Sequence, residues 1–298
     1  MGATRARVPD GEFITAQDFI WHLVSSQRHR HPEDDENAVT ERFARHEVVL
    51  SDATPLTPAD TLGPGTDVYF YRHPAPEERV PYEISTVYED ANIIVVKKPP
   101  FLATMPRASH ITENVTVRLR RATGNEELTP AHRLDRVTSG LILLTKQAEL
   151  RGAYQKLFAR RQVEKIYEAV APDVGLRAPL VWEHHIEKKE GILAARIVPG
   201  EEPNACTHVA DITPLTDRPG YARYVLKPIT GRTHQLRVQM HAAGAPIVDD
   251  PVYPVLLPAE AEDYSRPMQL ASIGLSFTDP LSGAHRSFTT DGWSGLPT

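Results

Sequence analysis

The stretch of sequence that decides the fold of this chain is His132-Arg133-Leu134-Asp135-Arg136-Val137-Thr138-Ser139-Gly140, which leads directly into the apolar run 141–144. The apolar run is typical of a buried strand. At the mouth of that strand, the carboxylate of Asp135 stands between Arg133 and Arg136, whose positive charges favour its ionised form. An ionised carboxylate in a polar loop is a candidate nucleophile, and the planar arginine forks suit a substrate that carries phosphate.

The commoner interpretation of such a cluster is structural, because surface arginine–aspartate networks usually contribute little to stability. The charge distribution bears on the choice. The net charge of −6 and the sequence pI near 6.1 argue against a general nucleic-acid coat protein. Residues 118–165, however, hold eleven Lys or Arg and only five Asp or Glu. This local basic excess is either a solvated helical face or a surface for nucleic acid.

Composition places the chain among soluble globular proteins. Its 298 residues are 41% hydrophobic and 24% charged, which suffices for one large domain and a small one. No apolar run reaches the ~18 residues of a membrane-spanning helix, and the first ten residues show no secretory signal. The single cysteine, Cys206, cannot form an internal disulfide, which fits a reducing compartment. We therefore expect a cytoplasmic protein without a membrane partner.

The sequence predicts a small N-terminal domain over residues 1–80. Apolar residues at helical spacing predict a helix over 15–25, with Thr15 as its N-cap. Short runs of β-branched and aromatic residues predict strands over 48–50 and 68–71. The segment 73–81 is rich in proline and charge, so we expect a stiff, extended linker and a domain boundary there.

Residues 81–298 form the second predicted domain. Apolar and β-branched runs predict strands over 93–96, 141–145, 165–170, 224–226 and 270–277. Helical spacing predicts helices over 146–161 and 234–241, whereas 171–205 is expected to be rich in loops. Because strands and helices do not alternate strictly, we expect an α+β fold with a mostly antiparallel mixed sheet and flanking helices.

The stretch 132–140 resembles the catalytic signature of the RluA-type pseudouridine synthases, which runs His-Arg-Leu-Asp, two variable residues, then Thr-Ser-Gly. All seven fixed positions match. Three further segments resemble motifs of the same family, in the same order: Lys165-Ile166-Tyr167, Thr230 to Arg237, and Pro246 to Tyr253. The resemblance covers roughly residues 85–280. Residues 1–80 are weakly similar to an S4-like RNA-binding module, and an unrelated small cap is the alternative.

The chain departs from the family pattern at four positions, where Lys97, Phe101, Asp249 and Ala271 replace the usual Asn, Gly, Gly and His. The histidine is missing from Leu270-Ala271-Ser272, and we expect its position to be peripheral to the chemistry, so that its loss affects only local packing.

The resemblance implies a pseudouridine-synthase-like fold and an isomerase that acts on uridine in structured RNA, either ribosomal or transfer RNA. Such an enzyme breaks the N1–C1′ bond, turns the uracil and rejoins it through C5. The reaction involves no redox change, so neither a cofactor nor a metal ion is expected. The target base must first leave the stack, and Arg133 is the candidate to fill the space that it vacates. DNA is not an expected partner, and a monomer is the default expectation.

The resemblance also implies roles for individual residues. Asp135 attacks as the nucleophile or assists elimination, and Arg232 is its expected counter-ion. Tyr167 is expected to stack on the target ring; its action as a base would require strong electrostatic help, since an ordinary phenol has a pKa near 10. The remaining residues expected to contact RNA or to line the pocket are Arg136, Lys165 and Leu236.

Two other classes of protein remain as alternatives. A non-catalytic RNA-binding or ribosome-assembly factor that retains the fold would bind RNA without isomerising it. A glycoside or nucleoside hydrolase could use Asp135, but such enzymes usually need a second, paired carboxylate. The histidines at 184, 185, 234 and 241 lack a Cys or Glu at a familiar zinc spacing, so no metal site is predicted.

Overall fold

The computed structural model describes residues 3–27, 30–73, 75–106 and 110–291. The chain divides into two compact units, Met1–Glu78 and Arg79–Thr298, which are called unit 1 and unit 2 below; the sequence placed the boundary at residue 80. Among the described residues, no helix combines the length and the apolar character needed to cross a membrane.

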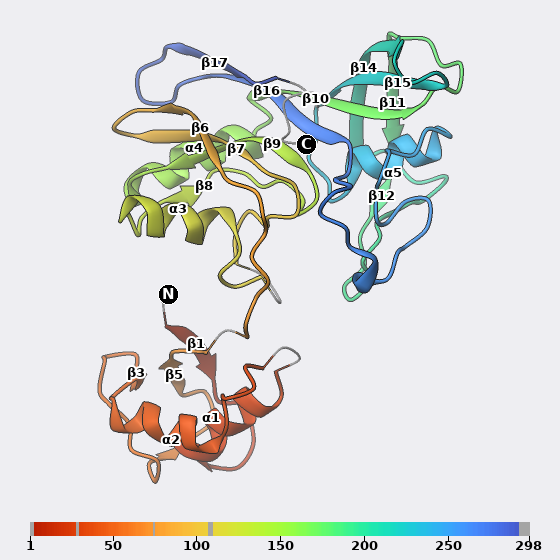
Figure 1. Ribbon diagram of the computed structural model, residues 1–298. Coiled ribbons are helices and arrows are strands. Elements are labelled where there is room, and N and C mark those ends of the chain that lie inside the picture. Colours follow the sequence, from red (N-terminus) through yellow and green to blue (C-terminus); the bar gives the residue numbers. More distant parts are fainter. Residues whose placement is uncertain (1–2, 28–29, 74, 107–109, 292–298) are drawn as a thin grey trace. The chain divides into compact units, whose positions relative to one another are not determined.

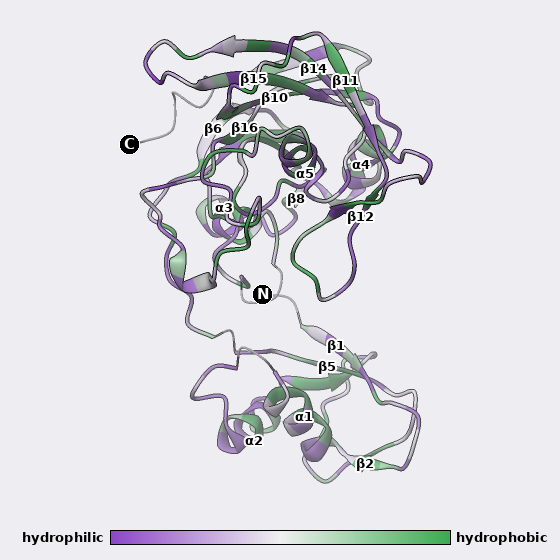
Figure 2. Ribbon diagram, turned by 90° about the vertical axis from the view of Figure 1, so that its right-hand side faces the viewer, coloured by the Kyte–Doolittle hydropathy of each residue, from purple (hydrophilic) through white to green (hydrophobic). Residues whose placement is uncertain are grey.

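Unit 1 packs two helices against a small sheet (Figure 1). The helices are α1 (Ala16–Ser25) and α2 (Glu36–Ala44); the strands are β1 (Thr4–Arg7), β3 (Val48–Leu50) and β5 (Asp67–Phe70), in the antiparallel order β1–β5–β3. Strands β2 (Ile14–Thr15) and β4 (Thr61–Leu62) form a separate pair. The predicted cap is confirmed, because Thr15 Oγ1 accepts a hydrogen bond from Asp18 N. Both helices carry hydrophilic and hydrophobic residues (Figure 2), and their buried residues join those of β3 and β5 in one core.

Unit 2 is built on a ten-stranded sheet. Its strands are β6 (Ser85–Glu89), β7 (Ile93–Lys98), β8 (Thr129–Pro130), β9 (Ser139–Thr145), β10 (Val163–Pro172), β11 (Leu180–His184), β14 (Ala205–Pro214), β15 (Tyr221–Pro228), β16 (Leu270–Thr278) and β17 (His285–Thr289). The order is β11–β14–β15–β10–β16–β9–β7–β6, with β17 paired to β16 and β8 to β9. Every pair is antiparallel except β16 with β9. The expected α+β class with a mostly antiparallel sheet is confirmed.

Helices cover both faces of this sheet. They are α3 (Val115–Thr123), α4 (Arg151–Ala159) and α5 (Gln235–Ala242), with short 3-10 turns at Ala148–Leu150 and Ala259–Ala261. Successive residues of a strand point to opposite faces. Ile142 and Leu144 of β9 therefore join the core that includes α3 and α5, whereas Leu141 and Leu143 join the core that includes α4. This two-sided burial explains why the run 141–144 is apolar throughout.

The region 171–205 holds more structure than the sequence predicted. It contains the edge strand β11 and the two-stranded sheet of β12 (Ile186–Glu187) and β13 (Arg196–Ile197). These strands are short, and their residues alternate between buried and exposed only over a few positions. Such short segments give a weak periodic signal in the sequence.

Gly140 allows β9 and β16 to approach each other closely in the middle of the sheet. Its backbone has a φ of 107°, and a Cβ atom at this position would lie 2.2 Å from the carbonyl oxygen of Ser272. Only glycine tolerates this approach. Ser272 pairs with Gly140 on one side and with Tyr167 on the other, where the register of β10 shifts by a bulge between Ile166 and Tyr167. The parallel contact therefore brings the segment after Asp135 close to Tyr167.

Candidate active site

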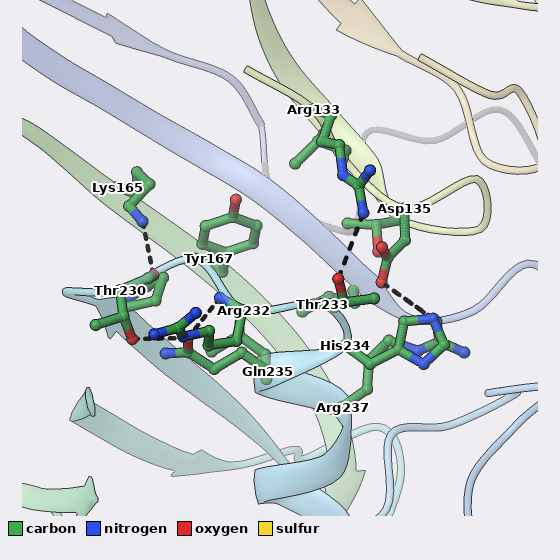
Figure 3. Close-up of a pocket in the computed structure, with 16 residues that line it drawn as sticks. Arg133, Asp135, Lys165, Tyr167, Thr230, Arg232, Thr233, His234, Gln235 and Arg237 are labelled. Atoms are coloured by element: carbon green, nitrogen blue, oxygen red, sulfur yellow. Dashed lines mark hydrogen bonds and ion pairs between the residues drawn. The ribbon is translucent and has the colours of Figure 1, made fainter. Parts of the chain in front are cut away.

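A cavity of about 110 Å³ opens where the loop before β9, strand β10 and the start of α5 meet (Figure 3). Six of the seven residues predicted for the site line it: Arg133, Asp135, Lys165, Tyr167, Arg232 and Leu236. The seventh, Arg136, does not. The cavity therefore brings together residues that are more than a hundred positions apart in the sequence.

The loop that carries Asp135 is fixed on both sides by buried polar side chains. Oγ1 of Thr104 donates to the carbonyl of Leu134 at 2.9 Å and accepts from its N–H at 3.1 Å. On the other side, Nζ of the fully buried Lys98 donates to the carbonyl of Arg136 at 2.9 Å. The same ammonium also donates to the carbonyls of Pro99 and Leu102. These bonds hold the main chain immediately before and after Asp135.

His132 orients the start of this loop. Its Nε2 atom accepts a hydrogen bond from the N–H of Leu143 at 3.2 Å, and its ring stacks on Phe158 with 4.2 Å between centroids. Burial lowers the pKa of His132 to about 3. The ring is therefore neutral at physiological pH and serves as a hydrogen-bond acceptor.

The guanidinium that holds Asp135 belongs to Arg237, and the prediction of Arg232 as counter-ion is wrong. Nη1 of Arg237 lies 3.3 Å from Oδ2 of Asp135. Arg232 instead donates from Nε to the carbonyl of Asn204 at 3.2 Å, and its side chain is exposed. The two arginines are separated by His234, which has a left-handed backbone with φ of 58° and starts α5. Figure 3 shows their side chains on opposite sides of that turn.

Arg237 is itself anchored by a second carboxylate. Its Nε and Nη2 atoms donate to the two oxygens of Asp250 at 2.8 and 2.6 Å, and both side chains are almost wholly buried. One cation thus serves two carboxylates. His234 adds no compensating charge, although its Nε2 lies 3.9 Å from Asp135, because burial lowers its pKa to about 4. The group therefore holds two carboxylates and one cation, which is compatible with the nucleophilic role predicted for Asp135.

The segment Thr230 to Gln235 is held in shape by one buried amide. Oε1 of Gln235 accepts from the hydroxyl of Thr230 at 2.7 Å and from the N–H of Arg232 at 3.0 Å. Its Nε2 atom donates to the carbonyl of Cys206 and to the hydroxyl of Thr207. These bonds give the glutamine of this motif a structural role: the amide satisfies donors and acceptors of a loop that has no strand partner.

Tyr167 lines the cavity with a buried aromatic ring. Burial raises the pKa of its phenol, and the negative charge of Asp135 raises it further. The phenol is therefore protonated at neutral pH. The electrostatic help that base action would require is not supplied, so the geometry favours the stacking role over the base role.

Two basic residues stand at the ends of the cavity. Nη2 of Arg133 lies 3.4 Å from Oγ1 of Thr233, and its side chain is exposed at the Asp135 end. Lys165 lies at the other end, where its Nζ donates to the carbonyl of Thr230 at 2.9 Å. Burial, with the positive charge of Arg161, lowers the pKa of Lys165 to about 8.

Arg136 is placed outside this cavity. Its guanidinium is paired with the carboxylate of Glu262 and donates to the carbonyl of Phe101. A role for Arg136 in RNA contact stays a prediction. Ala271, which stands where the family carries histidine, does not line the cavity, although its neighbour Leu270 does and Ser272 joins Gly140 to Tyr167.

Four residues of the site were not predicted to have a role in it: His234, Arg237, Asp250 and Tyr253. Tyr253 supports the group, because its hydroxyl contacts Nδ1 of His234 at 3.2 Å and Arg237 lies over its ring at 5.6 Å. The signal that could have found them is their place inside the two matching motifs, 230–237 and 246–253. Among the described residues, no three His, Cys, Asp or Glu side chains are grouped to hold a metal ion.

Comparisons with known proteins identify the family of this chain. Residues 92–242 match the family model described as RNA pseudouridylate synthase. The chain is 34% identical over 210 residues to the dual-specificity RNA pseudouridine synthase RluA of Salmonella typhi, which covers 68% of this chain and 90% of that protein. It is 30% identical over 184 residues to the mitochondrial tRNA pseudouridine(32) synthase of Saccharomyces cerevisiae, covering 61% of this chain and 39% of that one.

Among solved structures, human RNA pseudouridylate synthase domain containing 1 has a similar fold, with a TM-score of 0.56 and 24% identity over 70% of this chain and 83% of that one. The family model spans half of the chain, and the Salmonella relative matches over nine tenths of its own length. The chain therefore belongs to the RNA pseudouridylate synthase family, among its RluA-type members.

Proposed function

We propose that this protein isomerises uridine to pseudouridine in ribosomal or transfer RNA, with Asp135 as the catalytic carboxylate. The observation that carries the proposal is the position of Asp135 at the cavity, held by one guanidinium that a buried Asp250 already neutralises. The guanidinium fixes the position of the carboxylate at the cavity, where a flipped nucleoside can reach it. Membership of the family supports the reaction class.

The proposed reaction conserves the atoms of the nucleoside. The N1–C1′ bond of uridine breaks, C5 bonds to C1′, the hydrogen on C5 leaves as a proton, and N1 gains a proton. Asp135 either attacks C1′ or removes a proton from C2′ to give an elimination; both routes begin at the same carboxylate. We assign Tyr167 to stack on the uracil, a contact worth about 1–3 kcal/mol per base, and Leu236 to form the apolar wall beside it.

The target base must leave the RNA stack, at a cost of roughly a few kcal/mol. We assign Arg133 to occupy the vacated space, because it is exposed at the Asp135 end of the cavity. Ribosomal or transfer RNA as the substrate is supported by the names of the relatives, one a dual-specificity RNA enzyme and the other a tRNA enzyme. We further expect a cytoplasmic monomer that uses neither cofactor nor metal ion and binds neither DNA nor membranes.

We assign RNA contact to unit 2. Residues 1–78 contain fourteen Asp or Glu, seven Arg and no Lys, so unit 1 would repel a polyanion on balance. An S4-like role for unit 1 stays a prediction that this charge disfavours.

A hydrolase is less well supported, because the paired second carboxylate that it requires is not accessible. The carboxylate linked to Asp135 through Arg237 is Asp250, whose side chain is fully buried and whose oxygens are both bonded to that arginine. It has no space for the water that an inverting enzyme would activate. A purely binding role is also less well supported, because every observation that fits RNA binding alone fits catalysis equally well.

The test is the release of tritium from RNA transcripts that carry tritium on C5 of uridine. We expect the wild type to release tritium and Asp135→Asn to release none above background. Asp217→Asn, an exposed aspartate outside the cavity, is the matched control and should behave as the wild type. Equal release from Asp135→Asn and the wild type would overturn the assignment. Pseudouridine mapping of RNA from cells with and without the gene would then identify the uridine.

A further inference from the structure

A second, larger cavity of about 550 Å³ begins where the candidate active site ends. The two cavities share Lys165 and Pro228 in their walls. The larger one, called the basic groove below, is lined by Arg161, Gln162, Val163, Glu164, Lys165, His208, Lys227, Pro228, Ile229, Ser276, Phe277, Thr278 and His285.

The sheet brings these residues to one of its ends. Strand β10 starts at Val163, which is paired with Phe277 near the end of β16. Strand β15 ends at Pro228, and β17 starts at His285, opposite Thr278. The turn after α4 adds Arg161. Along β10, the groove lies at Val163 and the candidate active site at Tyr167, a distance of about 13 Å for an extended strand.

The groove carries an excess of positive charge. Arg161, Lys165 and Lys227 supply cationic groups, and His208 and His285 supply imidazole rings. Among the described residues that line it, Glu164 is the one carboxylate. Its charge is already engaged, because Oε1 lies 2.8 Å from Nζ of Lys227 and the hydroxyl of Ser276 donates to Oε2. An anion in the groove therefore meets cations that the carboxylate does not neutralise.

Of the three cationic side chains in the groove, Arg161 has the fewest interactions with other side chains and carbonyl groups. Its guanidinium makes no hydrogen bond or ion pair with any described residue, and it is exposed. Its backbone is left-handed, with φ of 57°, at the position after the C-cap of α4 where glycine is the preferred residue. Its positive charge also acts on Lys165, since it contributes to the lowered pKa of that side chain. A phosphate placed between the two cations would relieve this repulsion.

We propose that the basic groove binds the phosphodiester backbone of a single-stranded RNA segment that adjoins the flipped uridine. The inference rests on the proposed function for the identity of the polymer. The groove continues the candidate active site at the Lys165 end, away from Arg133 (Figure 3). The strand would enter at Arg161, pass Lys165 and deliver the uridine to Tyr167. Positively charged grooves that follow the backbone without reading bases are the usual solution for single strands.

Arg161→Gly is the decisive variant, because glycine favours the left-handed backbone at this position and so preserves the fold. Arg160→Ala is the matched control: it removes a neighbouring exposed arginine that lies outside the groove. The probe is an end-labelled oligouridylate, titrated with the full-length protein at several salt concentrations. Turnover is measured separately with the tritium-release assay.

We expect Arg161→Gly to raise the Kd for the oligonucleotide about tenfold at low salt, since hydrogen bonds to charged groups are among the strong ones. The slope of log K against log salt should become shallower by about 0.7, the loss of one phosphate contact on a single strand. The Arg161→Gly variant should raise KM and leave kcat unchanged. Arg160→Ala should match the wild type in Kd, salt slope, KM and kcat.

Equal affinities of Arg161→Gly and Arg160→Ala would overturn the proposal, as would a wild type that binds the oligonucleotide no better than Arg161→Gly. Displacement by millimolar inorganic phosphate at constant ionic strength would identify a site for a free anion and would also overturn it. A wild type that binds the oligonucleotide through Arg161 but releases no tritium would refute the proposed function and leave the groove intact.

Discussion

Nη1 of Arg237 lies 3.3 Å from Oδ2 of Asp135, while the other two nitrogens of the same guanidinium bind the buried Asp250. The arrangement uses all three nitrogens of one planar group. A lysine ammonium is a compact point charge without this fork. The position of Asp135 therefore depends on the shape of the arginine as well as on its charge.

Arg237→Lys should lower kcat about 10- to 100-fold, because a charge-assisted bond worth about 1.5–3 kcal/mol is lost at Asp135, the proposed catalytic carboxylate. Arg232→Lys should change kcat by less than about threefold, since Arg232 binds a backbone carbonyl at the exposed edge of the cavity. Both variants are compared by single-turnover tritium release at saturating RNA. The reverse order of effects would restore Arg232 as the counter-ion and contradict the geometry.

Gly140→Ala should prevent the parallel contact of β9 with β16. The added methyl group would lie 2.2 Å from Ser272 O and 2.4 Å from Ser272 N, and φ of 107° is unfavourable for alanine. We expect a loss of more than about 4 kcal/mol in the free energy of unfolding, in the range of severe core disruptions. Urea unfolding measures it.

The control for this substitution is Gly152→Ala. Gly152 lies inside α4 and does not have a positive φ, and a methyl group added there would meet no atom within 4 Å outside its own helix turn. Alanine is the better helix former, so this variant should gain about 0.5–1 kcal/mol. A Gly140→Ala variant as stable as the wild type would show that β9 and β16 can separate without cost.

The apolar strands β7, β9 and β16 could be predicted from sequence, whereas helices α2 and α3 and strands β12, β13 and β14 were not. The run 141–144 predicts a strand because both faces of β9 are buried. Helix α2 was missed because five of its nine residues are polar or charged and only Val39, Arg42 and Phe43 are buried. Strands β12 and β13 have two residues each, too few to show a period.

For the candidate site, the sequence motifs predict which residues gather but not how they pair. A motif identifies which side chains gather, since six of the seven predicted residues line the cavity. It does not reveal which of two arginines faces Asp135, because that depends on the left-handed turn at His234. Nor does it reveal that Asp250 neutralises Arg237, a contact between α5 and a loop thirteen residues later.

The lowered pKa of His132 predicts that the protein loses stability in mild acid. Its folded-state pKa of about 3 lies below the unfolded value near 6.5, so the unfolded chain binds a proton first as the pH falls. The free energy of unfolding therefore falls as the pH drops below 6.5. The loss is about 2 kcal/mol between pH 6.5 and 5, and it grows toward pH 3. Chemical unfolding at a series of pH values measures the slope.

His132→Gln supplies the comparison, because an amide oxygen can accept the hydrogen bond of Leu143 but does not titrate in this range. Its unfolding free energy should fall less steeply with decreasing pH than that of the wild type. Parallel slopes for the two proteins would show that the imidazole gains its proton without unfolding the loop.

The lowered pKa of Lys165 predicts that RNA affinity falls in mild alkali. Its pKa of about 8 means that the ammonium group loses its proton between pH 7 and 9, while Nζ stays placed at the carbonyl of Thr230. If that charge binds the RNA backbone, KM should rise by up to about tenfold over this range, the value of one charge-assisted contact, and kcat should change little. Lys165→Arg should show a smaller rise of KM than the wild type, since a guanidinium remains protonated there. Because both proteins meet the same RNA, ionisation of the uracil affects them equally and cancels in the comparison. Identical pH profiles of KM would assign the alkaline change to the RNA and remove Lys165 from the binding surface.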